Sequence, residues 1–189
     1  MRFFKIKRKP LVAIPQHEEL AILAGKRAGN IYDVHKICCA EAVLLVLNQG
    51  FGGGFTPEVA TNLGSSFCHG MGGAECVCGA LAGGELALSI FLGPRLEGGM
   101  KKKEFDKVAR QMHDRFQERY GSTCCRNLLK LKKEKKGATC KQLTQGAAEI
   151  CVELILEQRP ELVEKVDLDY LRTEESKVKA MAARLLGKG

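Results

Sequence analysis

The 189-residue sequence lacks any run of alternating apolar and polar residues long enough for a β-strand, which argues against a sheet. Apolar residues instead recur at three- and four-residue spacing. In the segment 101–121, for example, Phe105, Val108, Met112 and Phe116 would share one face of a helix. The length suits one domain. We therefore expect an all-α fold, a compact bundle of about six to eight helices around a central Gly/Ala-rich helix.

Long apolar runs are also missing. The stretch 76–93 approaches the length of a membrane span, but Glu85 interrupts it, so we predict a buried helix and no membrane span. The apolar segment 11–14 stops at Pro15 and is too short for a signal peptide, so we expect a cytoplasmic, reducing location.

Positive charge is concentrated in two places. The net charge is +8, the first nine residues carry five basic side chains, and 130–136 holds five Lys and one Glu, whereas the rest of the chain is close to neutral. A solvated arm and loop is one interpretation, and docking of an acidic electron-transfer partner is the other. Nucleic-acid binding is disfavoured, because neither zinc-finger spacing nor interleaved aromatic and basic residues accompany the charge.

Helix start and stop signals divide the chain into segments. Thr56 and Thr139 are typical N-caps, Gly29 predicts the end of the first helix, Asp33 predicts the cap of the next, and 122–123 predicts the cap of a short helix. Three regions result: a basic N-terminal arm over 1–16, a helical cysteine-rich redox domain over 17–160, and a C-terminal helix or tail over 161–189.

Cysteine is abundant, and its odd number argues against a closed disulfide framework. The nine cysteines are Cys38, Cys39, Cys68, Cys76, Cys78, Cys124, Cys125, Cys140 and Cys151. Several fall where a helix is predicted to begin. The free N–H groups of a first helical turn favour a thiolate, so we expect acidic thiols there. Cys39 is the exception, because it is predicted about two turns inside its helix.

Small residues recur along the helix that Cys76 and Cys78 precede. Gly79, Gly83 and Ala87 are spaced four apart, which costs about 1 kcal/mol of helix propensity per Gly relative to Ala. Such a helix lets another helix, or an inorganic cofactor, approach closely. Close packing alone is the alternative, and packing on a second copy would give a homodimer.

Four cysteines lie in motifs of a known family. Cys39 in CAEAVLL, Cys78 in CGALAG, Cys125 in GSTCCRNLL and Cys140 in ATCKQL have the order and context of the C_GCAxxG_C_C family of redox-active proteins, which the chain resembles over about residues 20–157. The module is also similar to part of the split-Soret cytochromes c. The resemblance implies an all-helical fold and a redox role in anaerobic metabolism.

The resemblance further implies that Cys39, Cys78, Cys125 and Cys140 form a set suited to an iron–sulfur cluster, with two irons favoured over four by analogy. Haem is not implied, because no C-x-x-C-H motif is present. Electron transfer or redox sensing is the function expected.

Other interpretations remain open from the residues themselves. Metal-free thiol–disulfide chemistry could use the C-x-C pair Cys76 and Cys78 or the vicinal pairs at 38–39 and 124–125. A structural zinc site is another possibility, although C-x2-C pairs are absent. Cys68 has no assigned role, and Cys151 falls on an apolar helix face, as a core residue would. His35 is a candidate hydrogen-bond donor to the nearby cysteines. No hydrolase or dehydrogenase motif is present, and the residues do not decide whether the protein is an enzyme.

Overall fold

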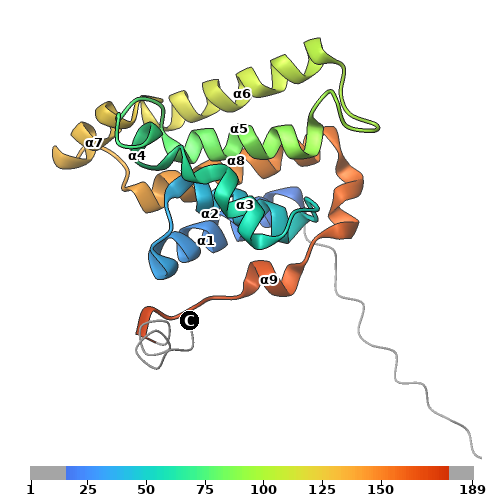
Figure 1. The fold of residues 1–189 in the computed structure, drawn as a ribbon, viewed down its shortest axis with the longest axis horizontal. Helices are drawn as coiled ribbons and strands as arrows, with labels where there is room; N and C mark the ends of the chain where they lie inside the picture. The colour runs from blue at the N-terminus through green and yellow to red at the C-terminus, as the bar shows by residue number, and fades with distance from the viewer. Residues whose placement is uncertain (1–15, 179–189) are drawn as a thin grey trace, which may run out of the picture.

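Residues 16–178, the part of the chain that the computed structural model describes, form nine α-helices and one 3₁₀ helix and no strand (Figure 1). This confirms the all-α prediction. The helices are α1 (His17–His35), α2 (Cys39–Phe51), α3 (Pro57–Ser65), α4 (Cys68–Met71), α5 (Gly79–Leu92), α6 (Lys102–Tyr120), α7 (Cys125–Lys133), α8 (Cys140–Gln158), the 3₁₀ helix (Pro160–Lys165) and α9 (Leu168–Arg172).

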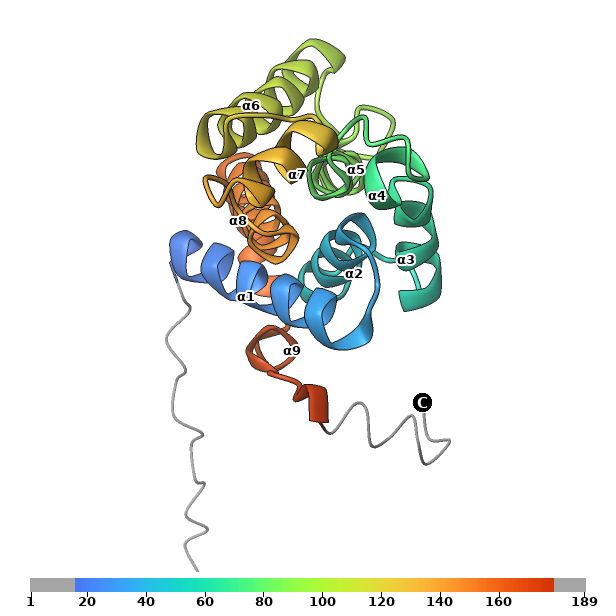
Figure 2. The ribbon, with the colours of Figure 1, turned by 90° about the vertical axis from the view of Figure 1, so that its left-hand side faces the viewer.

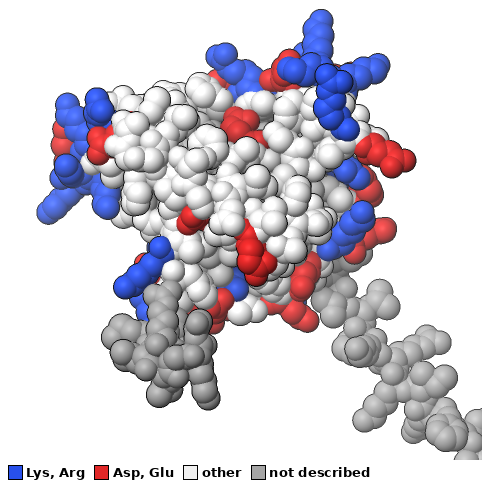
Figure 3. Space-filling view, in the orientation of Figure 1, with Lys and Arg blue, Asp and Glu red and all other residues white. Residues whose placement is uncertain are grey.

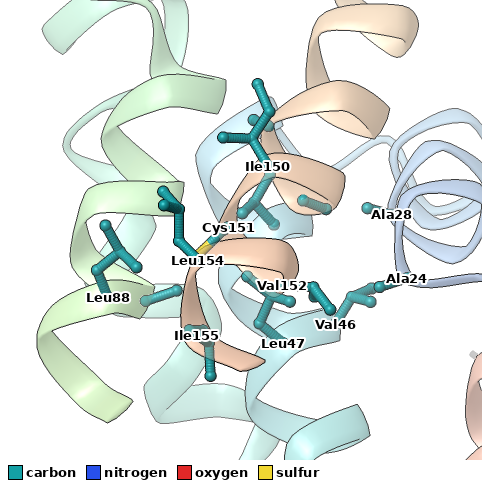
Figure 4. Close-up of a cluster of buried hydrophobic side chains, with 14 of the residues drawn as sticks. Ala24, Ala28, Val46, Leu47, Leu88, Ile150, Cys151, Val152, Leu154 and Ile155 are labelled. Atoms are coloured by element: carbon teal, nitrogen blue, oxygen red, sulfur yellow. The ribbon is translucent and has the colours of Figure 1, made fainter. Parts of the chain in front are cut away.

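Helices α2, α5 and α8 form the centre of the bundle and begin at the same end of it (Figures 1 and 2). Helix α1 packs on α8 and α2, and α6 packs on α5 and α8 from the other side. The core between them is made of aliphatic side chains such as Leu47, Leu88, Leu154 and Ile155, all fully buried (Figure 4). Cys151 lies among them, as expected of a core residue, and its Sγ donates to the Gly84 carbonyl oxygen at 3.3 Å.

The small residues of α5 serve close packing within the chain. A Cβ built on Gly83 would lie 2.8 Å from the Ala40 carbonyl oxygen of α2, and one built on Gly84 would overlap Met112 of α6. Both faces of α5 are thus covered by helices of the same molecule. The reason for expecting a dimer through this helix is therefore wrong, although the homodimer itself stays a prediction.

Two of the predicted caps are confirmed. The Thr56 side chain accepts from the Val59 N–H, and the Thr139 side chain accepts from the Gln142 N–H. At 122–123 the prediction is wrong, since the N-cap of α7 is Cys124. The Ser122 Oγ instead accepts the Cys124 N–H at 3.1 Å.

The predicted boundary between the first two helices is also wrong. Helix α1 continues through Gly29 to His35, because Gly29 makes room for α8: a Cβ there would lie 2.5 Å from the Gln145 Cγ. Asp33 therefore lies inside α1, where it pairs with Lys141 of α8 at 3.2 Å rather than capping a helix. The chain breaks at Lys36, which has a left-handed φ of 57°, and α2 begins at Cys39.

The C-terminal segment returns to α1. Arg27 is only 5% exposed, donates to the Thr173 carbonyl oxygen and to Glu175, and stacks on the Tyr170 ring. Of the predicted arm, 1–15 lie outside the described residues, as do 179–189 of the predicted tail.

The basic run at 130–136 is half helical rather than a loop, because α7 extends to Lys133. Lysines and arginines gather at the edges of the face shown in Figure 3, including the end where α7 lies. None of the helices described is long and apolar enough to cross a membrane.

Candidate cysteine site at converging helix starts

The four cysteines of the expected set all lie where a helix begins. Cys39, Cys125 and Cys140 are the first residues of α2, α7 and α8, and Cys78 is the N-cap of α5. The prediction that Cys39 lies two turns inside its helix is wrong, because the break at 36–38 makes it a helix start as well. The structure brings the four cysteines together around one pocket, which Gly79, Leu128, Leu143 and Lys132 also line.

Backbone pairing holds two of these cysteines next to each other. The Cys78 N–H donates to the Thr123 carbonyl oxygen at 2.8 Å, and the Cys125 N–H donates to the Cys76 carbonyl oxygen at 2.6 Å. These bonds flank an isolated antiparallel bridge between Val77 and Cys124. Two segments far apart in sequence therefore bring Cys78 and Cys125 to the same pocket, one on each side of this bridge.

Glycine makes room for the thiols at two points. A Cβ built on Gly79 would lie 2.6 Å from the Cys39 Sγ, and one built on Gly70 would lie 2.7 Å from the Cys125 Cβ. Gly70 also has a φ of 72°, which side chains rarely adopt. The start of α5 is therefore glycine because the Cys39 thiol occupies the space that a side chain would take.

Three of the thiols, those of Cys39, Cys78 and Cys125, are less acidic than their positions at helix starts predict. Burial, together with the nearby Cys78 and Cys140 thiols, raises the pKa of Cys39 to about 12. The same causes raise the pKa of Cys125 to about 11, and burial raises the pKa of Cys78. Backbone N–H groups do lower the pKa of Cys39 and Cys78, as expected, but desolvation outweighs them. For Cys78 and Cys125 the expectation of an acidic thiol is therefore wrong, because a buried thiol holds its proton unless positive charge replaces it.

The spacing of the four thiols does not match that of ligands around one metal ion. A tetrahedral zinc ion holds its sulfur ligands about 2.3 Å away, and so about 3.8 Å from one another. Within residues 16–178, three candidate ligand atoms lie within 4.8 Å of one another only at Cys38, Glu41 and Cys68. No three of the four converging thiols meet this condition, so the group is wider than a single-ion site.

A second cavity of about 420 Å³ adjoins the pocket, because Cys39, Cys125 and Cys140 line both. Tyr32 lies at this cavity, where burial, the charges of Cys140 and Cys39 and a hydrogen bond with Cys140 raise its pKa to about 12. Sequence reasoning missed Tyr32, and nothing in its local sequence marks it. The free space between the four thiols is only about 20 Å³, so a larger group would extend toward this cavity.

One disulfide is present, and the sequence did not predict it. Cys38 is joined to Cys68 across 30 residues, rather than to its neighbour Cys39, while the other seven cysteines are free. Cys38 and Cys39 are therefore not joined in this structure, and thiol–disulfide exchange stays a prediction. His35, a candidate hydrogen-bond donor to the cysteines, pairs with Glu175 at 2.5 Å.

Comparison with known proteins bears on the redox role. The family model described as "Putative redox-active protein (C_GCAxxG_C_C)" matches residues 37–154, well over half of the chain. This span contains all of the converging cysteines. No curated protein matches the chain, and no solved structure matches it. The chain therefore belongs to the C_GCAxxG_C_C family, and its role is a redox one.

Proposed function

We propose that the protein transfers electrons or senses redox state with one iron–sulfur cluster bound by Cys39, Cys78, Cys125 and Cys140. The observation that carries this proposal is the convergence of four helix starts, each with a cysteine, on one pocket. The wide spacing of the thiols favours a cluster of several irons over a single ion such as zinc.

The residues present fit such a group. Four cysteine thiolates are the usual ligands of both two-iron and four-iron clusters, which supply one-electron transfer when bound. The raised pKa values of Cys39 and Cys125 indicate that the chain alone does not stabilise four thiolates, so cationic iron would have to replace their protons.

The surroundings of the pocket support the same proposal. The N–H groups of the first turns of α2 and α5 face Cys39 and Cys78, and hydrogen bonds to ligand sulfur raise the potential of a cluster. Leu128 and Leu143 form apolar walls that would keep water away. Lys132 lines the pocket and would offset part of the negative charge of a thiolate-bound cluster.

A partner of negative charge also fits this end of the molecule. Four more exposed lysines lie near Lys132 in the sequence: Lys130, Lys133, Lys135 and Lys136. Because Lys132 itself lines the pocket, an acidic redox protein docked on the lysines around it would come close to the four thiols. The rate of electron exchange with an acidic flavodoxin should then fall as ionic strength rises.

The test is purification without oxygen, followed by iron and sulfide assays, visible absorption and low-temperature EPR. We expect iron and acid-labile sulfide in equal amounts, both lost in Cys78→Ser and in Cys125→Ser. Cys151→Ser and Cys76→Ser are matched controls, because these cysteines do not line the pocket, and both should keep the cluster. A colourless protein without iron, or one zinc per chain without sulfide, would overturn the proposal. The EPR spectrum distinguishes two irons from four.

A further inference from the structure

The Cys38–Cys68 disulfide lies beside the pocket, and neither of its cysteines belongs to the set of four that line the pocket. Cys38 directly precedes Cys39 in the chain and lines the open cavity together with Cys39, Cys125 and Cys140. Neither Cys38 nor Cys68 is fully buried. Cys38 therefore borders a cavity that is open to solvent, which distinguishes this disulfide from one enclosed in a core.

The two sulfurs have different surroundings. Cys38 is the N-cap of the 13-residue helix α2, and its N–H donates to the Glu41 carboxylate. Cys38 lines the open cavity, whereas Cys68 is not among the residues that line it. Cys68 lies instead at the start of the short irregular helix α4, where His69 has a left-handed φ of 54°.

The Glu41 carboxylate lies beside both sulfurs. An oxygen of Glu41 is within 4.8 Å of each sulfur. The carboxylate is held in place by two hydrogen bonds of 2.7 Å, from the Cys38 N–H and from the Ser65 hydroxyl. The Ser65 bond joins the end of α3 to the start of α2 next to the disulfide.

We propose that Cys38 and Cys68 form a redox-active disulfide that exchanges with an external dithiol in the open cavity, with Cys38 as the exchanging sulfur and Cys68 as the resolving one. A thiolate of the dithiol attacks the Cys38 Sγ, a mixed disulfide forms, and Cys68 leaves as a thiolate and takes a proton. The second thiolate of the dithiol then attacks its own sulfur in the mixed disulfide and releases Cys38. The dithiol loses two electrons and becomes a disulfide, while Cys38 and Cys68 gain two electrons and two protons.

The loop that follows Cys68 connects this exchange to the four thiols. His69, Met71 and Glu75 all have positive φ values, between 54° and 68°, which ordinary side chains adopt only when their surroundings impose them. On one side the loop is joined to α2 by the disulfide. On the other side, the Cys125 N–H donates to Cys76 and the Arg126 N–H donates to Glu75. Opening the disulfide would release the loop from α2, while its hydrogen bonds to Cys125 and Arg126 would remain.

The exchange is tested on the whole protein in dithiothreitol buffers of graded oxidised-to-reduced ratio. Thiols are alkylated at equilibrium, and the mass of each cysteine-containing peptide is measured by mass spectrometry. We expect Cys38 and Cys68 to change together, as one reversible two-electron couple, without unfolding by circular dichroism. If the pair stays oxidised in excess reduced dithiothreitol, or opens only when the protein unfolds, the disulfide is structural and the proposal is wrong.

Two single variants then assign the roles. Cys68→Ser leaves the Cys38 thiol and Cys38→Ser leaves the Cys68 thiol, and each reacts with 2,2′-dithiodipyridine at neutral pH. Cys38 should react at least about tenfold faster than Cys68, and faster than the exposed Cys76 in the same chain. Equal rates, or a faster Cys68, would contradict the assignment. The exchange needs no metal, so this result and the iron and sulfide assays can fail independently.

Discussion

The Cys39 sulfur lies against Gly79 at the start of α5. A Cβ built on Gly79 would lie 2.6 Å from the Cys39 Sγ and 2.8 Å from the Phe67 carbonyl oxygen. Gly79 thus lies between the Cys39 sulfur and the Phe67 backbone, where a side chain would not fit. The contact explains why α5, in the centre of the bundle, begins with glycine, a residue of low helix propensity.

Replacing this glycine should damage the site. Gly79→Ala places a methyl group against sulfur and backbone, so we expect a loss of about 1–3 kcal/mol in the free energy of unfolding and a lower iron content. Urea unfolding and iron assays measure both. Gly84→Ala is the matched control on the same helix, because its new methyl group meets only the flexible end of Met112. Full iron content in Gly79→Ala would contradict the importance of this contact.

The cap of α8 positions Cys140. The Thr139 side chain accepts the Gln142 N–H, and the Gln142 side chain accepts the Thr139 N–H. Thr139→Ala should therefore cost about 1 kcal/mol of stability. Thr56→Ala removes an equivalent cap from α3, which carries no pocket cysteine, and should cost a similar amount. Only Thr139→Ala should also lower the iron content, and equal iron in the two variants would contradict this role.

Glu85 makes stability depend on pH. Burial raises the pKa of this carboxyl group from 4.5 to about 7. Between these values the folded protein keeps the proton and the unfolded chain releases it, so the free energy of unfolding should fall as pH rises through the window. Glu85→Gln removes this dependence. Its melting temperature should exceed that of the wild type at pH 8 and match it more closely at pH 4. Parallel melting curves across this range would contradict the prediction.

The charge of the buried Arg27 is neutralised by an ion pair with Glu175. The two side chains are 2.6 Å apart, and Arg27 is 5% exposed whereas Glu175 is 31% exposed. Glu175→Gln leaves the buried guanidinium without its carboxylate and should cost about 1–3 kcal/mol. Glu161→Gln breaks the more exposed pair with Arg159 and should cost less than about 1 kcal/mol. Chemical denaturation of the two variants under the same conditions makes the comparison, and equal losses would show that burial of Arg27 does not matter.

Sequence by itself was sufficient for the features that depend on neighbouring residues. Helical periodicity predicted α6 with its buried face of Val108, Met112 and Phe116, because side chains three and four apart necessarily share a face. Thr56 and Thr139 were recognised as caps because a cap acts within three residues. The all-helical class and the family of the chain followed from patterns of this local kind.

Tertiary structure alone decided the features that join distant residues. Gly29 has the properties of a helix stop, yet it continues α1, because packing against Gln145 of α8 favours glycine there. The resulting break before Cys39 turned a residue predicted inside a helix into a helix start. Burial likewise reversed the expected acidity of Cys78 and Cys125, since desolvation depends on neighbours from distant parts of the chain. The Cys38–Cys68 disulfide joins residues 30 apart, and no local rule relates them.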